Sequence, residues 1–241
     1  MKLGSISIRP GTTGTFFYER AFQHLGIKGS YRAIKCERLN EIKAIVDSGE
    51  FSGLSISMPF KSQVMVFCND VDPSTFCGES INTMKFMSDG RIIGYNTDQA
   101  GVEAAVSNLA SGKTAILGSG SMAKVFSREL EKRGLEFELY SRKLGNWEER
   151  NIAISNVINC TPIGMDGISI PINNLSGIKV IVDLPISSLE FEKRAKVMGV
   201  SYFSGLEFYG HVFLKQLSVY TGKNITKQEL EEIKKEWTAR V

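Results

Sequence analysis

Midway along the chain the sequence reads Lys113-Thr114-Ala115-Ile116-Leu117-Gly118-Ser119-Gly120-Ser121-Met122-Ala123, and this stretch decides the fold class. Residues 113–117 predict a short buried strand, and residues 122–133 predict a helix that Gly134 ends. A strand that runs through Gly-x-Gly-x-x-Ala into a helix is typical of a dinucleotide-binding turn, because backbone N–H groups at the helix start can hold a pyrophosphate. The alternative is a plain strand-to-helix turn without a ligand.

The residues after the next predicted strand, 136–140, indicate which dinucleotide binds. NAD-binding folds usually place an acidic residue there, which binds the ribose hydroxyls. This chain has Ser141-Arg142-Lys143 instead. Two cations attract a 2′-phosphate, so the sequence favours NADP as the cofactor. The alternative is that Arg142 and Lys143 are simply exposed loop charges.

Elsewhere, short β-branched runs alternate with helical patterns, which predicts an α/β fold with βαβ units and a mostly parallel sheet. In the first half these segments are residues 3–8, 17–25, 31–34, 39–46 and 54–57. A β-hairpin is predicted next, with strands 81–87 and 91–95 turned by Ser88-Asp89-Gly90, and then a helix over 99–109. The second half predicts further strands at 153–158 and 179–183, giving a sheet of roughly five or six strands, and closing helices at 205–220 and 227–238.

Composition excludes several classes of function. The chain has 241 residues, 42% of them hydrophobic, and a net charge of +3. No dense basic block occurs apart from a mixed Glu/Lys stretch at 227–236, so we expect no nucleic-acid partner. No apolar run is long enough to span a bilayer, so we expect no membrane partner either.

The positions of the cysteines and histidines predict a reducing compartment and no metal-binding site. The four cysteines, at positions 36, 68, 77 and 160, show no paired CxxC spacing, and the first residues lack a secretory apolar core. Together these features predict a cytoplasmic protein. His24 and His211 fit neither a metal-ligand spacing nor a nucleophile elbow, so both are predicted to be ordinary helix residues.

Two polar motifs upstream of the glycine loop carry the chemistry. They read Ser55-Ile56-Ser57-Met58-Pro59-Phe60-Lys61 and Asn96-Thr97-Asp98. A lysine beside an aspartate can pass a proton to or from the oxygen of a ketone or alcohol during hydride transfer. With the nucleotide loop, this pair predicts hydride chemistry on a small hydroxy acid. The alternative is a surface salt bridge between Lys61 and Asp98.

At these residues the chain resembles the shikimate dehydrogenase family, in order and over nearly its whole length. Gly53 to Lys61 resembles that family's Gly-x-Asn-Val-Thr-x-Pro-x-Lys segment, and Gly94 to Asp98 its Gly-x-Asn-Thr-Asp. Asn159 to Met165 resembles its Asn-x-Thr-Pro-x-Gly-Met. The remaining matches are residues 82–83 with its Ala-Val-Asn-Thr, 118–123 with its nucleotide loop, 141–143 with its phosphate clamp, and 205–222 with its closing helix.

The resemblance implies two domains and one reaction. Residues 1–100 with 205–241 would form the substrate-binding catalytic domain, and residues 101–204 an NADP-binding Rossmann domain. The reaction would be the reversible reduction of 3-dehydroshikimate to shikimate in aromatic biosynthesis. Lys61 would be the general acid/base, Asp98 its partner and Asn82 the residue that orients substrate hydroxyls. Cofactor-binding residues would be Gly118, Ser119, Gly120, Ser121, Met122, Ala123, Ser141, Arg142, Lys143, Thr161 and Gly205.

The departures from the family lie where it holds its substrate. The family's Ser-x-Ser-Pro is represented by Thr12-Thr13-Gly14-Thr15, so Thr12 keeps one hydroxyl and Gly14 loses the other. Arg9 nearby can bind a carboxylate in bidentate fashion. Ser57 replaces a threonine but keeps the hydroxyl. The family's substrate-binding glutamine falls on Val212, which cannot form a hydrogen bond, and the tyrosine of its Tyr-x-Pro segment has no clear counterpart near residues 183–185.

Three hypotheses follow for a small-molecule ligand. The first is an NADP-dependent shikimate dehydrogenase, with Arg9 and Thr12 compensating for lost contacts. The second is the same chemistry on quinate or another hydroxy acid, which Gly14 and Val212 favour. The third is a regulatory module that binds NADP without turnover. The expected oligomeric state is a monomer or a homodimer. The first strand is expected at the edge of its sheet, a place where dimers form. Residues 166–167 line the nicotinamide or form a plain turn.

Overall fold

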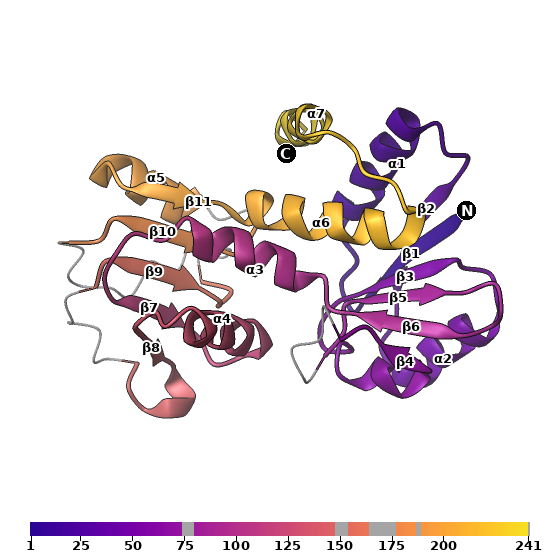
Figure 1. Ribbon diagram of the computed structural model, residues 1–241, viewed down its shortest axis with the longest axis horizontal. Helices are drawn as coiled ribbons and strands as arrows, with labels where there is room; N and C mark the ends of the chain where they lie inside the picture. The colour runs from indigo at the N-terminus through magenta and orange to yellow at the C-terminus, as the bar shows by residue number, and fades with distance from the viewer. Residues whose placement is uncertain (74–79, 148–153, 164–176, 187–188, 241) are drawn as a thin grey trace. The chain divides into compact units, whose positions relative to one another are not determined.

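The computed structural model describes residues 1–73, 80–147, 154–163, 177–186 and 189–240, which form two compact units (Figure 1). The first unit is Met1–Gln99 with Val212–Val241, and the second is Ala100–His211. The boundaries lie inside helices α3 (Asp98–Ser107) and α6 (Gly205–Thr221). An α/β fold with two units and a mostly parallel sheet is the predicted fold class, which is confirmed. The division of labour between the units stays a prediction.

The first unit is built on a six-stranded sheet in the order β2-β1-β3-β5-β6-β4. Here β1 runs parallel to β2 and β3, whereas β5 is antiparallel to both β3 and β6. The parallel part follows from the alternation of strands and helices at the N-terminus. The strands are β1 (Lys2–Ser7), β2 (Ser30–Lys35), β3 (Gly53–Ile56), β4 (Asp70–Val71), β5 (Thr83–Phe86) and β6 (Ile92–Tyr95).

The predicted hairpin is confirmed, because β5 and β6 pair directly and Gly90 turns between them with a φ of 85°. The expectation that the first strand lies at the sheet edge is wrong. β1 pairs with β2 on one side and β3 on the other, so β2 is the edge strand. The reason is that the chain crosses from β1 to β2 in one direction and then returns past β1 to form β3.

Helices cover both faces of this sheet (Figure 1). One face packs on α2 (Leu39–Asp47) and the 3-10 helix η1 (Gln63–Phe67), with Ile42 and Val64 in the same buried cluster as Ile6 and Leu54. The other face packs on α1 (Thr13–Leu25) and the last turns of α6, and α7 (Lys227–Thr238) packs on α1. Aromatic rings of these helices meet edge to face. Phe17 of α1 and Phe213 of α6 pack in this way, with 5.3 Å between their ring centroids.

Helix α7 begins as its sequence predicts. Thr226 accepts a hydrogen bond from the Glu229 backbone N–H at 3.2 Å, and the Glu229 carboxylate accepts from the Thr226 backbone N–H. This capping box satisfies backbone donors that a helix start otherwise leaves without intrahelical partners. The hydrogen bonds from Thr226 hold the pKa of the Glu229 carboxyl below its usual range.

The second unit is a five-stranded parallel sheet in the order β11-β10-β9-β7-β8. Every residue of β7, β9 and β10 is buried, as expected for parallel strands covered on both faces. The chain leaves β7 for β8 on one side and β9 on the other, so the topological switch point lies at the C-terminal end of β7. The strands are β7 (Thr114–Leu117), β8 (Phe137–Tyr140), β9 (Asn156–Asn159), β10 (Val180–Asp183) and β11 (Ser201–Phe203).

The helices of the second unit are α4 (Ser121–Lys132), the 3-10 helix η2 (Arg142–Leu144) and α5 (Leu189–Met198). The prediction missed α5 and β11. Strand β11 has only three residues, too few for a clear period of two, and α5 has little amphipathic character. Both are held by the tertiary core instead, where Phe191 and Ala195 of α5 pack with Ile181 of β10.

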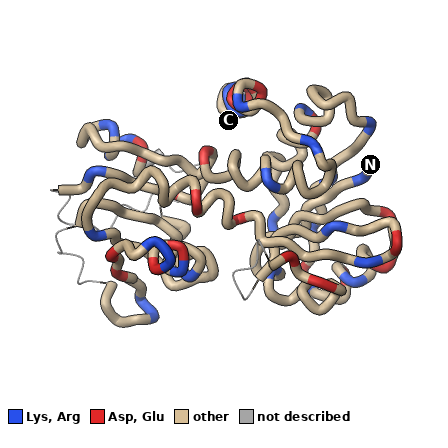
Figure 2. The backbone as a smooth tube through the Cα atoms, viewed as in Figure 1, with Lys and Arg blue, Asp and Glu red and all other residues tan. Residues whose placement is uncertain are grey.

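Charged residues of both signs are distributed over each unit, and α7 carries both (Figure 2). Many of them pair locally, as Lys43 does with Asp47 at 2.5 Å. The absence of a nucleic-acid partner stays a prediction. Within the described ranges, no helix is both long and apolar enough to cross a membrane.

We expect Gly53→Ala to destabilise the first unit, because a Cβ there would lie 2.5 Å from ring carbons of Tyr220 and 3.1 Å from the Met84 carbonyl oxygen. Overpacking of this kind lowers the free energy of unfolding by about 1–3 kcal/mol. Urea denaturation would measure the change. Gly11→Ala is the control, since no atom lies within 4 Å of a Cβ at that position. Equal stabilities of the two variants would contradict this account of the packing.

Candidate functional site

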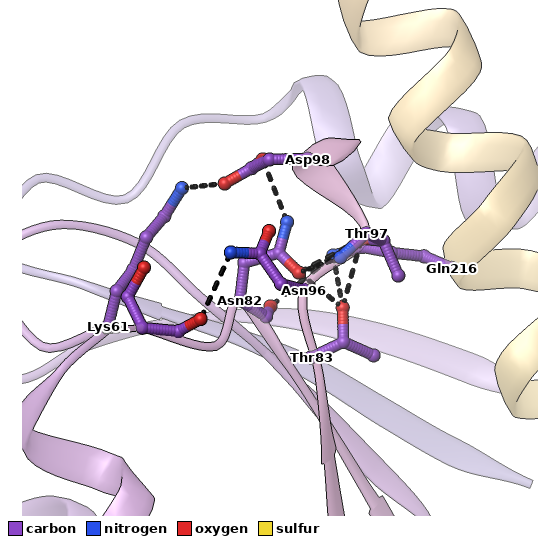
Figure 3. Close-up of polar contacts among 8 residues, drawn as sticks. Lys61, Asn82, Thr83, Asn96, Thr97, Asp98 and Gln216 are labelled. Carbon is purple, nitrogen blue, oxygen red and sulfur yellow. Dashed lines mark hydrogen bonds and ion pairs between the residues drawn. The ribbon is translucent and has the colours of Figure 1, made fainter. Parts of the chain in front are cut away.

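Lys61 and Asp98, 37 positions apart in the chain, meet in the first unit. The Lys61 Nζ donates to Asp98 Oδ2 at 2.5 Å (Figure 3). The two side chains are only 16% and 10% exposed, so the pair is not a surface salt bridge. An ammonium carries three N–H donors, and two remain beyond the one directed at Asp98. The pair therefore has both the proton and the spare donors that a reacting oxygen needs.

Asn82 completes this group. Its Nδ2 donates to Asp98 Oδ1 at 2.8 Å, so each carboxylate oxygen has a hydrogen-bond partner. Its Oδ1 accepts from the Thr97 backbone N–H at 2.8 Å and from the hydroxyls of Thr97 and Thr83 at 2.9 Å each. Because Oδ1 is saturated, Asn82 can offer a ligand only its second N–H. It acts as a donor and not as an acceptor.

Strand pairing brings these residues together. Asn82 directly precedes β5 and Asp98 begins α3 just after β6, and the Asn82 backbone N–H donates to the Tyr95 carbonyl at 3.0 Å. On the other side, the Ile56 N–H of β3 donates to the Asn82 carbonyl at 2.7 Å. The Ile81 N–H donates to the Lys61 carbonyl at 3.0 Å, which anchors the loop that follows β3. The β3-β5-β6 register thus fixes the site.

The predicted substrate residues Arg9, Thr12 and Ser57 are all exposed and lie just beyond the ends of β1 and β3. Ser57 donates its backbone N–H to the Ile6 carbonyl at 2.9 Å, so the two strand ends share one edge of the sheet. Among the hydrogen bonds described, none joins Arg9 or Thr12 to Lys61. Their substrate contacts stay predictions.

Sequence reasoning missed the residues behind the two family departures. A Cβ at Gly14 would lie 3.0 Å from the Tyr31 ring and 3.2 Å from its hydroxyl oxygen, so the absent side chain makes room for Tyr31. Burial raises the pKa of Tyr31, which keeps its hydroxyl protonated at neutral pH. One turn after the buried Val212, α6 carries Gln216, whose amide reaches Thr83 at 2.9 Å. The available signal for Gln216 was a polar residue on the face of the helix that Val212, Phe213 and Tyr220 make apolar.

The glycine loop of the second unit lies at the topological switch point. Gly118 has a φ of 109°, and its N–H donates to the Tyr140 carbonyl at 2.8 Å. Gly120 precedes α4, and no atom lies within 4 Å of the position that a Cβ would take, so there is free space beside the start of the helix. Ala123 is fully buried. Ser119, Ser121 and Met122 complete the loop, and their contacts with a nucleotide stay predictions.

Ser141, Arg142 and Lys143 form the turn after β8. The Ser141 hydroxyl accepts from the Leu144 backbone N–H at 3.1 Å and so caps η2. Asn146 braces the turn from behind, because its amide bonds to the Ser141 N–H and to the Leu139 carbonyl. Arg142 and Lys143 are exposed at this position. Both cations are thus presented where a 2′-phosphate would be bound.

A buried carboxylate shapes the neighbouring turn at Thr161. Asn159 donates to Asp183 Oδ1 at 2.7 Å and accepts from the Thr161 backbone N–H and hydroxyl at 3.1 and 2.6 Å. Thr161 in turn lies against the loop, 3.1 Å from where a Gly118 Cβ would be. Burial, and next the Asp183 charge, raise the pKa of the Cys160 thiol, so it is protonated and unreactive at neutral pH. Residues 166–167 lie outside the described residues.

Gly205 begins α6 in close contact with the loop after β10. A Cβ there would lie 2.4 Å from the Leu184 carbonyl oxygen and 2.5 Å from that of Pro185, so only glycine fits. His24 lies in α1 and His211 in α6. Across the described residues, no group of three or more His, Cys, Asp or Glu side chains could hold a metal ion.

The chain is similar to known proteins over most of its length. Residues 13–84 match the family model of the shikimate dehydrogenase substrate binding domain. The shikimate dehydrogenase (NADP(+)) of Archaeoglobus fulgidus is 29% identical over 85% of this chain and 86% of that protein. The shikimate dehydrogenase-like protein of Haemophilus influenzae is 26% identical over 95% and 93%. A solved shikimate 5-dehydrogenase-like protein is 26% identical over 98% of this chain and 96% of that one, with a TM-score of 0.81.

We expect Asn159→Ala to destabilise the second unit, because it removes one of the donors to a fully buried carboxylate at Asp183. Hydrogen bonds to charged groups contribute about 1.5–3 kcal/mol to the free energy of unfolding. Urea denaturation followed by tryptophan fluorescence would measure the loss. Asn108→Ala removes an exposed amide of the same unit and serves as the control. A loss no larger than in the control would show that this pair does not hold the turn.

Proposed function

The chain belongs to the shikimate dehydrogenase family, and on this premise we propose that it catalyses the NADP-dependent, reversible reduction of 3-dehydroshikimate to shikimate. The observation that carries this proposal is the contact between Lys61 and Asp98, with Asn82 on the second carboxylate oxygen. It joins a proton carrier, a charge that holds it, and a fixed hydrogen-bond donor.

NADPH supplies a hydride to the carbonyl carbon of the substrate when it is bound. The carbonyl oxygen then develops negative charge, and the Lys61 ammonium donates a proton to it. Asp98 holds the Lys61 amine in place throughout. After the proton transfer, water returns a proton to the Lys61 amine. In the reverse direction the neutral amine of Lys61 takes the proton of the shikimate hydroxyl. Asn82 donates its remaining N–H to a substrate oxygen, because its own carbonyl is saturated.

The residues of the second unit fit NADP. The free space at Gly120 and the start of α4 would hold the pyrophosphate, and Arg142 and Lys143 would hold the 2′-phosphate. Thr161 and Gly205 would complete the cofactor site. We further propose that the enzyme works in the cytoplasm, which the free thiols of Cys36, Cys68 and Cys160 support.

A second candidate is the same chemistry on quinate or another ring hydroxy acid. Tyr31 occupies the space that a side chain at residue 14 would fill, and Val212 offers no hydrogen bond at a family substrate position. These two changes alter the shape and polarity around the substrate and leave Lys61, Asp98 and Asn82 in place. A regulatory module without turnover has no physical need for that intact group.

We expect NADPH-linked turnover of 3-dehydroshikimate that falls about 10²- to 10⁴-fold in Lys61→Met, the usual contribution of a general acid. NADPH absorbance would measure it, with NADH and 3-dehydroquinate run in parallel. Lys43→Met is a matched control, because Lys43 also pairs with an aspartate at 2.5 Å but on a surface where both side chains are 58% exposed. Turnover confined to 3-dehydroquinate or another acid would favour the second candidate. Binding of NADPH without turnover of any acid would favour the regulatory module.

We expect the double variant Arg142→Ala/Lys143→Ala to lose its preference for NADPH, because loss of the exposed charged contacts to the 2′-phosphate costs about 1.5–3 kcal/mol of binding in total. The KM for NADPH should rise about 10- to 100-fold, whereas the KM for NADH should hardly change. Lys196→Ala, an exposed lysine of the same unit, is the control. Parallel losses with both cofactors would mean that these cations do not read the 2′-phosphate.

A further inference from the structure

Behind Asn82 lies a second layer of polar side chains that the reaction above does not use. Its centre is Gln216 of α6, which is only 5% exposed (Figure 3). The Gln216 Nε2 donates to the Thr83 hydroxyl at 2.9 Å and reaches the Asn82 carbonyl at 3.4 Å. Its Oε1 accepts from the hydroxyls of Tyr18 and Ser55, each at 3.3 Å. One amide of α6 thus connects α1 with the two strands β3 and β5.

The hydrogens in this layer run in one direction. Because Ser55 donates to Gln216, the Tyr220 hydroxyl at 3.0 Å is the donor in its contact with Ser55. Because the Gln216 amide nitrogen can only donate, the Thr83 hydroxyl accepts from it and directs its own hydrogen onward. The acceptors within reach are Asn82 Oδ1 at 2.9 Å and the Thr97 hydroxyl at 3.1 Å.

The chain of donors ends at the catalytic pair. Asn82 Oδ1 receives the hydrogens of Thr83 and Thr97, and Asn82 Nδ2 donates to Asp98. Linked hydrogen bonds polarise one another, so an amide whose oxygen accepts more donors has a stronger N–H donor at its other end. Gln216, Thr83, Asn82 and Asp98 therefore form one polarised route, which Ser55 and Tyr220 join as members of a branched hydroxyl cluster.

We propose that Gln216 is a positioning residue, which through Thr83 strengthens the hydrogen bond from Asn82 to Asp98 and sets the donor strength of Asn82 toward the substrate. The effect on catalysis rests on the proposed function, whereas the effect on Asn82 does not. The competing account is that Gln216 merely packs α6 on the sheet. That account predicts a loss of stability without any change at Asn82.

Two substitutions separate these accounts. Gln216→Met keeps the volume and removes both polar ends, so kcat should fall roughly 2- to 13-fold, the worth of one neutral hydrogen bond, with little change in the KM for NADPH. Gln216→Glu keeps the shape but replaces the donor by an acceptor, which turns the Thr83 hydrogen away from Asn82. A buried carboxyl is protonated more readily than an exposed one and can then donate. The activity of Gln216→Glu relative to wild type should therefore recover as the pH falls.

A cycle with Thr83 tests the route. Thr83→Val should lower kcat as Gln216→Met does. The kcat of the double variant should be no lower than that of either single variant, because both substitutions break the same hydrogen-bond route to Asn82. Thr83→Ser keeps the hydroxyl, so its kcat should stay close to that of the wild type. Leu217→Ala is the control, since Leu217 is fully buried in the same helix as Gln216 and its side chain takes no part in these hydrogen bonds. It should lower the melting temperature and leave kcat unchanged.

The ¹⁵N NMR signal of the Asn82 side-chain amide gives a readout independent of activity. It should move in Gln216→Met and Thr83→Val and stay in place in Leu217→Ala and Thr83→Ser. If Gln216→Met does not fold, Thr83→Val carries the test. An Asn82 signal that stays in place, or losses in kcat that simply add in the double variant, would overturn the proposal. A wild type inactive on 3-dehydroshikimate with a moving Asn82 signal would overturn the proposed function alone.

Discussion

The ion pair between Lys61 and Asp98 is the constraint on which the rest of the first unit depends. Taking two charges out of water costs several kcal/mol per ion, which only close contact and further hydrogen bonds offset. Here each Asp98 oxygen has a donor, from Lys61 or from Asn82, and the Asn82 oxygen has three donors of its own. These partners come from different strand ends. The register of β3, β5 and β6 is therefore a condition for burying the charges at all.

The second unit holds a buried carboxylate by the same means. Asp183 is fully buried and accepts from Asn159 and from the Tyr202 hydroxyl at 3.2 Å. The hydrogen bonds that Asn159 makes in return fix the turn at Thr161, which lies against Gly118. A nucleotide loop needs a firm neighbour, because its glycines have no side chains to hold their own conformation. In both units a satisfied buried carboxylate thus shapes a loop that the proposed reaction needs.

The departures from the family have physical counterparts in the packing. Gly14 lacks a hydroxyl, and the Tyr31 ring takes the space, with its hydroxyl close to the missing Cβ. Val212 lacks an amide, and Gln216 carries one a single helical turn later, where it faces Thr83 in place of a ligand. The polar groups of this region are relocated within the core. Under the proposed function, these two changes alter the pocket around the substrate and leave Lys61, Asn82 and Asp98 in place.

Local sequence determined much of this protein. The strand, glycine loop and helix at residues 113–133, the hairpin turned by Asp89-Gly90, and the capping box at Thr226 depend on contacts within a few residues, so their patterns are legible. Motif order also indicated Lys61, Asn82 and Asp98, although their roles stay predictions. Only the tertiary structure decided that β1 lies inside its sheet, that α5 and β11 form, and that Gln216 meets Thr83. Those features rest on contacts between residues far apart in the chain, which leave no local pattern because each partner is chosen by packing.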